Sequence, residues 1–228
     1  MLNAENLTKR FSGLTAVDHV SLAVHRGETV GLIGTNGAGK TTLFEMLSGF
    51  LRPDEGTVRF GGKNLTGQAA WRFARAGMAR TFQNLRLFEG MTVLENVRAA
   101  QIACHGRKAE ELLRTVNLWE KRERPAQFLS YGEKRRLELA RAAATGAMLV
   151  LADEPSAAMT AAEAQELAEV LETLKAGDGL TFLLIEHNMD LVRRACGRVY
   201  AMDRGRVLAE GTPDEVLSSS AVKASLLP

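Results

Sequence analysis

The segment Gly34-Thr-Asn-Gly-Ala-Gly-Lys-Thr41 is the feature of this sequence that most restricts its fold. It fits the pattern G-x-x-x-x-G-K-[ST], between an apolar run at 28–34 and an amphipathic stretch that ends before Pro53. Glycines at these places let the backbone curl so that successive N–H groups point at an anion, beside the positive end of the following helix. We therefore predict a strand, a phosphate-binding loop and a helix. The predicted nucleotide contacts are Asn36, Gly37, Ala38, Gly39, Lys40, Thr41 and Thr42.

Side chains in this loop and in a second segment predict chemistry on a nucleotide. The Lys40 ammonium can bridge β- and γ-phosphates, and the Thr41 hydroxyl can bind Mg²⁺. The second segment is the apolar run at 149–152, which ends in Asp153-Glu154. A strand that ends in a carboxylate places Asp153 at the carboxyl edge of a parallel sheet, where Mg²⁺ would be held. Because consecutive strand residues point to opposite faces, Glu154 must lie at the strand exit if it is to reach the same site and polarise water.

Strand and helix patterns alternate at both ends of the chain and enclose a helical middle. Residues from about 71 to 141 have a mostly helical pattern. We predict β structure with turns over residues 2–35, including strand-like runs at 21–24 and 28–34. The segment 57–65 has the pattern of a strand and a glycine turn, further strand-like runs occur at 148–154 and 181–186, and 198–203 can pair with 206–211 as a hairpin. We therefore predict an α/β core interrupted by a helical lobe. Four helix starts carry a capping box, at Thr92…Glu95, Ser130…Glu133, Thr160…Glu163 and Thr212…Glu215.

Composition excludes several classes of protein. Of the 228 residues, 46% are hydrophobic and 25% charged, which is typical of globular proteins and not of disordered chains. A net charge of +2 does not favour nucleic-acid binding, so we expect no nucleic-acid partner. The longest apolar run, 147–152, is too short to span a membrane. Two cysteines without a CxxC or Cys/His cluster predict a reducing compartment and no structural zinc.

The run Leu129-Ser-Tyr-Gly-Glu133, followed by KRRLELARA and the acidic strand, narrows the choice among nucleotide hydrolases. Here the chain resembles the nucleotide-binding subunit of ATP-binding-cassette (ABC) proteins, whose signature LSGGQ stands at that place. The resemblance covers essentially the whole chain, with the motifs in the family's order. It implies an α/β fold with a RecA-like P-loop NTPase core, an N-terminal antiparallel β region and an inserted α-helical subdomain. We expect one nucleotide-binding domain over 1–228, with a core lobe at about 1–82 and 147–228 and a helical lobe at about 83–146.

The resemblance also implies roles for five further residues. Gln83 matches the glutamine that touches Mg²⁺ or the attacking water, and His187 matches the switch histidine that contacts the γ-phosphate. Phe11 falls where the family places an adenine-stacking ring, although a lone aromatic near a strand end is more often part of the core. Ser130 and Gly132 match residues that reach the γ-phosphate bound by the other subunit. The Ser130 hydroxyl also caps its helix, and both roles can hold, because a capped helix aims its positive end at the phosphate.

These matches imply ATP and Mg²⁺ as cofactors. The implied metal ligands are Thr41, Gln83 and Asp153, and the implied catalytic residues are Glu154, His187 and Gln83.

Three stretches, 31–60, 79–97 and 129–142, are similar to the ATPase subunits of branched-chain amino acid importers, and urea and short-chain amide importers remain open. The resemblance implies two ATPase subunits, identical or different, around two Mg-ATP. It also implies transmembrane permease subunits and, indirectly, a substrate-binding protein. The expected location is cytoplasmic, on the inner face of the cell membrane. The alternative is a soluble ABC ATPase without a transport role.

Besides Tyr131 and Glu133 in the signature, where such variants are familiar in this branch, the chain departs from the family's pattern at two places. The segment Ser156-Ala-Ala-Met-Thr160 has Ala158 where glycine is usual, and Thr160 where an acid or amide bridges the two active sites. We therefore expect hydrolysis with weak cooperativity between sites. The stretch between 97 and 130 is also shorter than in branched-chain relatives, and His105-Gly106-Arg107 marks a candidate deletion.

Overall fold

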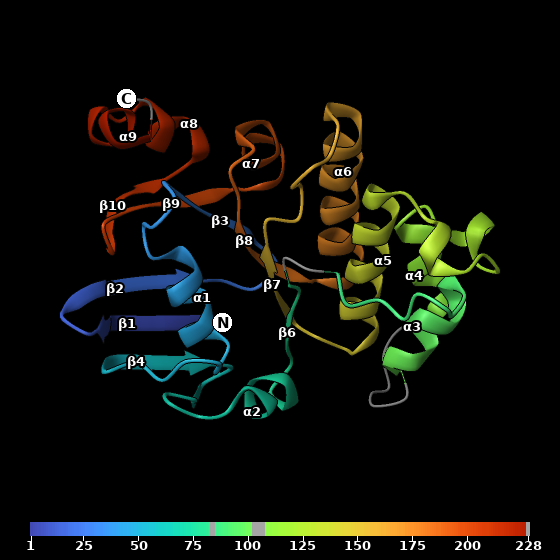
Figure 1. Ribbon diagram of the computed structural model, residues 1–228, viewed down its shortest axis with the longest axis horizontal. Coiled ribbons are helices and arrows are strands. Elements are labelled where there is room, and N and C mark those ends of the chain that lie inside the picture. Colours follow the sequence, from blue (N-terminus) through green and yellow to red (C-terminus); the bar gives the residue numbers. More distant parts are fainter. Residues whose placement is uncertain (83–84, 102–107, 227–228) are drawn as a thin grey trace.

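The computed structural model describes residues 1–82, 85–101 and 108–226, which form two β-sheets (Figure 1). The first sheet is antiparallel, in the order β2-β1-β4-β5. Its strands are β1 (Leu2–Phe11), β2 (Leu14–Val24), β4 (Glu55–Phe60) and β5 (Lys63–Asn64). Register shifts interrupt the pairing of β1 with β2 between Ala4 and Arg10.

The second sheet has the order β10-β9-β3-β8-β7-β6 over the described part of the chain. Neighbouring strands from β9 to β6 are parallel, and β9 and β10 form the predicted antiparallel hairpin. The carboxyl ends of parallel strands lie at one edge of a sheet, so the segments that follow β3, β7 and β8 meet there. The strands are β3 (Thr29–Gly34), β6 (Met78–Arg80), β7 (Leu149–Asp153), β8 (Thr181–Ile185), β9 (Arg198–Asp203) and β10 (Arg206–Gly211).

Alternate residues of the parallel strands enter two separate hydrophobic clusters. Leu149 and Leu151 of β7 pack in the cluster that α1 (Lys40–Leu47) shares with the antiparallel sheet. Val150 and Ala152 pack in the other cluster, which the helices on the opposite face form. Because side chains alternate along a strand, Asp153 continues the face of Leu149 and Leu151. The strand pattern therefore directs the Asp153 carboxyl to the side on which α1 packs.

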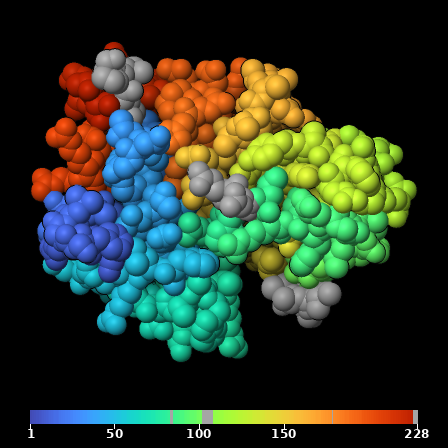
Figure 2. Space-filling model, in the orientation of Figure 1, coloured from blue at the N-terminus to red at the C-terminus, as the bar shows by residue number. Residues whose placement is uncertain are grey.

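The described residues between β6 and β7 are mainly helical and project from one side of the molecule (Figures 1 and 2). They form α3 (Val93–Gln101), α4 (Ala109–Thr115), 3₁₀ turns at Trp119–Lys121 and Ala126–Phe128, and α5 (Tyr131–Ala144). Helix α5 packs against α6 (Ala161–Asp178), the helix between β7 and β8. This contact joins the helical part to the rest of the molecule (Figure 1). The remaining helices are α2 (Ala70–Arg75), α7 (Met189–Ala195), α8 (Pro213–Ser218) and α9 (Ser220–Leu226). Across the described ranges, no helix has the length and apolar character that crossing a membrane requires.

The fold confirms the α/β core with a helical middle and corrects two details. A helical pattern is predicted from about residue 71, whereas Met78–Arg80 forms β6 at the edge of the parallel sheet. The prediction of a mostly helical stretch is confirmed, but it misses these three residues, because their pairing with β7 overrides their local pattern. The strand predicted at 21–24 is the end of a longer one, β2. All four predicted capping boxes form.

Candidate functional site

The glycine-rich loop connects the end of β3 to the start of α1, as its sequence predicts. Gly39 has a φ of 97°, and a Cβ there would stand 2.3 Å from the Ala16 carbonyl oxygen, so only glycine fits. The turn between β9 and β10 holds the loop from another side, because the Gly205 N–H donates to the Ala38 carbonyl at 3.0 Å. The loop is therefore fixed at the N-terminus of α1, a position at which backbone N–H groups bind anions.

Lys40 holds its ammonium group against this loop. Its Nζ donates to the carbonyl oxygens of Gly34 and Thr35, both at 2.9 Å. The side chain is buried, and burial lowers the pKa of Lys40, while the Glu154 and Asp153 carboxylates oppose that shift. The lysine is thus a cation held by the backbone of its own loop and influenced by the two predicted carboxylates.

Asp153 ends β7 with a side chain that is only 9% exposed. Arg80 Nη2 lies 3.7 Å from its Oδ2. Burial raises the pKa of Asp153, Arg80 opposes the shift and Glu154 adds to it. Thr41, in the first turn of α1, is exposed. A hydroxyl and a buried carboxylate are hard oxygen donors of the kind that Mg²⁺ prefers, so these residues fit the predicted metal chemistry.

Glu154 leaves β7 through a left-handed turn with a φ of 49°, and its N–H donates to the Ile185 carbonyl at 3.0 Å. The turn ends the alternation of side chains between the two faces of the strand. Glu154 Oε1 then lies 3.1 Å from His187 Nε2. The side chains are 25% exposed for Glu154 and 42% for His187, so water and a nucleotide can reach both. Two of the predicted catalytic residues are therefore in contact, although they follow different strands.

A cavity of about 510 Å³ connects the loop to Glu154. Of the predicted loop residues, Ala38 is buried and does not line this cavity in the part of the chain described. Besides Glu154, the predicted residues that line it are Asn36, Gly37, Gly39, Lys40, Thr41 and Thr42. The cavity thus joins a phosphate-binding loop to a carboxylate that can act on water.

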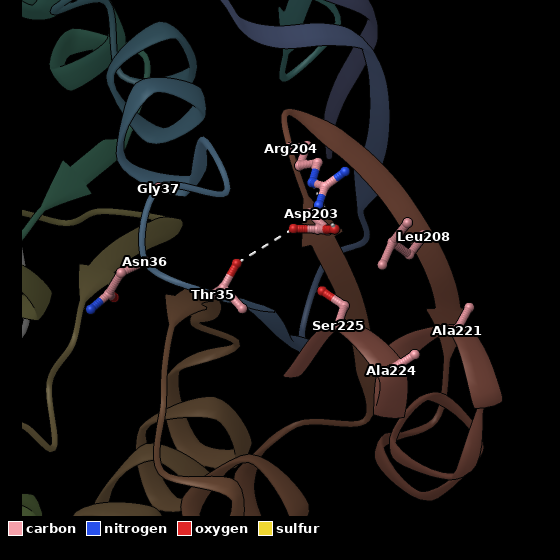
Figure 3. Close-up of a pocket in the computed structure, with 9 residues that line it drawn as sticks. All are labelled: Thr35, Asn36, Gly37, Asp203, Arg204, Leu208, Ala221, Ala224 and Ser225. Carbon is pink, nitrogen blue, oxygen red and sulfur yellow. Dashed lines mark hydrogen bonds and ion pairs between the residues drawn. The ribbon is translucent and has the colours of Figure 1, made fainter. Parts of the chain in front are cut away.

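A second cavity, of about 580 Å³, lies on another side of the loop (Figure 3). Here Thr35 faces the end of β9, with its Oγ1 3.5 Å from Asp203 Oδ1, and α9 closes the opposite wall (Figure 3). Among the described residues that line this cavity, neither Lys40 nor Glu154 occurs. The smaller of these two cavities, which both Lys40 and Glu154 line, is therefore the candidate nucleotide site.

The other predicted residues lie away from this cavity or outside the described chain. Phe11 ends β1 as an exposed residue (44%), and the described lining of the cavity contains the nearby Leu14 instead. Ser130 and Gly132 lie at the N-terminus of α5, and neither is among the described lining residues. Gln83 lies outside the described residues, as does the candidate deletion at 105–107.

Among the described residues at the site that were not selected from the sequence, three are charged. Arg80 contacts Asp153, Arg204 lines both cavities, and Glu186 accepts hydrogen bonds beside His187. Two of them carry a signal that could have been used. Arg80 stands three residues before Gln83 in one motif, and Glu186 is the polar residue that ends the apolar run of β8.

A strand, a glycine-rich loop with its lysine and a carboxylate pair at the end of a nearby parallel strand define a P-loop nucleotide-binding domain. The model of the ABC transporter family matches residues 17–157. The chain belongs to this family, and membership implies ATPase activity.

Relatives and solved structures support the same assignment. The chain is 40% identical to the high-affinity branched-chain amino acid transport ATP-binding protein LivG of Salmonella typhimurium, over 95% of this chain and 93% of that protein. The ADP conformation of MJ1267, an ATP-binding cassette of an ABC transporter, has a TM-score of 0.89 and 33% identity, covering 98% of this chain and 97% of that one. A dimeric post-hydrolysis state of the cassette MJ0796, bound to ADP and Pi, has a TM-score of 0.79 and 25% identity, covering 93% and 99%.

Proposed function

We propose that this chain is the ATP-hydrolysing subunit of a transporter that imports branched-chain amino acids or a similar small polar solute through a separate permease. Two observations carry the enzymatic part of this proposal: Glu154 contacts His187, and Glu154 lines a cavity together with Lys40. The likeness to LivG carries the choice of substrate. The proposed location follows, at the inner, cytoplasmic face of the cell membrane.

Hydrolysis of ATP at this site is mainly a matter of position and charge. The loop N–H groups and Lys40 would bind the phosphates. Thr41 and Asp153, with Gln83, are the proposed Mg²⁺ ligands, and the ion would neutralise charge on the phosphate oxygens. Glu154 would accept a proton from the attacking water, as general base. His187, 3.1 Å from Glu154, would orient that carboxylate and contact the γ-phosphate.

A second cassette completes the proposed site. Ser130 and Gly132 lie at the capped N-terminus of the 14-residue helix α5, outside the described lining of the nucleotide cavity. The positive end of such a helix favours an anion. We therefore assign it to the γ-phosphate bound by the other subunit, and the dimeric state of the MJ0796 cassette supports this arrangement. The second subunit would be a copy of this chain or a sister ATPase.

An apolar cavity of about 400 Å³ supports contact with the permease. It lies where the proposed core lobe (about 1–82 and 147–228) meets the proposed helical lobe (about 83–146), since Phe82 and Thr145 both line it. Phe50 and Trp71, which are 55% and 57% exposed, also line it. Exposed aromatic side chains around a concavity are typical of protein contact sites, so we assign it to an apolar cytoplasmic segment of the permease. The substrate-binding protein would act through the permease, and no nucleic acid is involved.

The enzymatic proposal is tested by Glu154→Gln, which keeps the shape of the side chain and removes the base. We expect ATP to bind about as tightly as before and the turnover number to fall by about two orders of magnitude or more. The measurements are steady-state phosphate release and nucleotide affinity, with Mg²⁺ and with EDTA. Glu169→Gln, on the exposed face of α6, is the control. Normal turnover in Glu154→Gln would remove Glu154 as the base.

The transport proposal is tested by purifying the tagged chain from gently solubilised native membranes and identifying the proteins that accompany it. We expect two hydrophobic permeases, with or without a second cassette. Recovery from the soluble fraction without a membrane partner would favour a soluble ABC ATPase and contradict the transport role.

A further inference from the structure

Glu186, which directly follows β8, is only 2% exposed, so its carboxylate is buried. A charged group this deep in a protein is unfavourable unless hydrogen bonds or an opposite charge compensate for lost water. Within residues 1–82, 85–101 and 108–226, no cationic side chain forms an ion pair with it, and its compensation comes from hydrogen bonds. Those bonds identify what the carboxylate holds.

Both carboxylate oxygens of Glu186 are used, and they bind two different segments. Oε1 accepts from the Ser156 N–H at 2.9 Å, and Oε2 accepts from the Ser156 hydroxyl at 2.9 Å. Oε2 also accepts from the N–H groups of His187 at 3.1 Å and Asn188 at 3.2 Å. Ser156 stands two residues after Glu154 in the segment that follows β7, whereas His187 and Asn188 follow β8. The carboxylate therefore cross-links the segment of Glu154 to the segment of His187.

These contacts close a ring at the proposed catalytic site. Glu154 contacts the His187 ring, His187 adjoins Glu186, and Glu186 binds Ser156, which leads back through Pro155 to Glu154. A cavity of about 290 Å³ is lined by members of this ring. Sheet pairing fixes β7 against β8 only as far as Asp153 and Ile185, so beyond the sheet this carboxylate fixes the two segments through side-chain bonds.

We propose that Glu186 is a positioning residue for ATP hydrolysis: its carboxylate holds the Glu154 segment and the His187 segment in the register that lets the two side chains meet. It does not touch the nucleotide in this role. The inference rests on the proposed function, because it concerns the same reaction. Misplacement of reacting groups by about 1 Å lowers rates by about a hundredfold, so a residue that sets this register affects turnover more than binding.

The test uses Glu186→Gln, which keeps the size of the side chain but has one acceptor oxygen and an NH₂ group that faces N–H donors. We expect kcat to fall by about tenfold to a hundredfold, with the KM for ATP changed less than about threefold. Ser156→Ala, which removes only the hydroxyl donor, should give a smaller fall in kcat and guards against failure of the first variant to fold. Glu28→Gln is the control, since Glu28 also binds a backbone N–H and pairs with Arg198 far from the site.

A double variant separates positioning from a general effect on the fold. If Glu186 acts through the contact of Glu154 with His187, adding Glu186→Gln to His187→Ala should lower kcat further by less than about threefold. An equal fall in both backgrounds, or an unchanged kcat in Glu186→Gln and Ser156→Ala, would overturn the proposal.

Hydrogen exchange gives a readout that does not depend on activity. The Ser156, His187 and Asn188 amides should exchange faster in Glu186→Gln than in the wild type, while amides in β1 and β2 should be unchanged. Unchanged exchange at the three amides would contradict the cross-link. A wild-type protein without ATPase activity would instead contradict the proposed function, and the exchange comparison would still decide whether Glu186 holds the two segments together.

Discussion

Left-handed backbone occurs twice between β7 and α6, at Glu154 (φ 49°) and at Ala158 (φ 60°). At Glu154 the turn moves the carboxylate out of the strand's alternation and onto His187. Ala158 is exposed and stands where the family usually has glycine. This conformation costs a residue with a Cβ about 1–2 kcal/mol, so the segment is strained at Ala158.

Ala158→Gly should therefore stabilise the protein. Relief of the left-handed strain outweighs the greater freedom that glycine has in the unfolded chain, about 0.5–1 kcal/mol, and leaves a gain of about 0.5–1 kcal/mol. For a chain of this size that gain raises Tm by about 1–4 °C. Urea and thermal unfolding measure it, with Ala162→Gly in the first turn of α6 as the control that should be destabilised. A lower stability for Ala158→Gly would show that no strain is stored there.

Thr160→Asp tests the expected weak cooperativity. Thr160 caps α6, with its hydroxyl oxygen 3.3 Å from the Glu163 N–H, and aspartate caps helices about as well, so the fold should persist. With the carboxylate that usually bridges the two sites restored, we expect a higher Hill coefficient for ATP and a changed ATPase rate. Thr160→Ser, which keeps a capping hydroxyl without charge, should behave as the wild type. Identical kinetics for aspartate and serine at this position would count against a bridging role.

At the scale of elements, capping boxes stabilise the first turns of four helices. The glutamates of these boxes lose this effect when acid protonates them. The pKa of Glu163 lies below its usual 4.5 because the Thr160 N–H and hydroxyl bind its carboxylate. Glu95 with Thr92, and Glu215 with Thr212, have lowered pKa values for the same reason. Each helix start is thus held by a carboxylate that must be charged.

Stability should consequently fall as the solution becomes acidic. These carboxyls bind protons more weakly in the folded than in the unfolded chain, so their support is complete above pH 4.5, the usual pKa, and is lost as the pH falls through the lowered values. Glu163→Gln should make stability less dependent on pH below 4.5. Unfolding by urea between pH 3 and pH 7 measures this, with Glu169→Gln as the control. The same pH slope in Glu163→Gln and the wild type would show that the box does not depend on charge.

Sequence patterns predicted the elements that carry local signals. The loop at 34–41, the strand before Asp153 and the capping boxes all follow from residue types at fixed spacing. Strand β6 does not, because three residues of ordinary pattern become a strand only through their pairing with β7. The bounds of β2 within the β structure predicted over 2–35 were missed for a related reason, since register shifts break the alternation that a sequence pattern can detect.

At the scale of the whole molecule, one copy of the chain carries two half-sites on the proposed assembly. Lys40 and Glu154 line the nucleotide cavity, whereas Ser130 lies at the start of α5, outside the described lining. On the proposed assembly, a complete site takes its loop and base from one cassette and its α5 from the other. Interfaces of this kind are symmetric in a homodimer, so each pair of chains contains two sites.

Mixing two inactive variants should therefore restore activity. Lys40→Ala disables the loop, and Ser130→Asp keeps a capping oxygen but sets a negative charge against the phosphate of the other site. In a mixed dimer both defects fall on one site and the other is intact, so a one-to-one mixture should recover about a quarter of wild-type ATPase activity. Lys40→Ala mixed with Glu154→Gln is the control and should stay inactive, because these residues belong to the same site. Recovery in the control, or in neither mixture, would contradict the shared site.

The sequence predicted the site residues that stand within a motif. It missed the residues that reach the site only through contacts between distant segments of the chain. Lys40 and Glu154 were found because each stands in a recognisable run. Arg204 reaches the cavity because a hydrogen bond from Gly205 to Ala38 anchors its turn to the loop, and no local pattern encodes that contact. Glu186 was missed because a single polar residue after an apolar strand, although it can be seen in the sequence, has no spacing that assigns it a role.

The hydrogen bonds of Lys40 within its own loop have a consequence for nucleotide turnover. Because Nζ donates to the Gly34 and Thr35 carbonyls, the loop itself supplies hydrogen-bond acceptors for its ammonium group. An arriving phosphate must compete for that ammonium group, and the carbonyls can reclaim it when the phosphate leaves. Binding is then an exchange of partners with a moderate net gain, and the resting loop needs no collapse or refolding between cycles. An ATPase that releases its products in every cycle benefits from a lysine whose hydrogen-bond partners in the loop are available again at once.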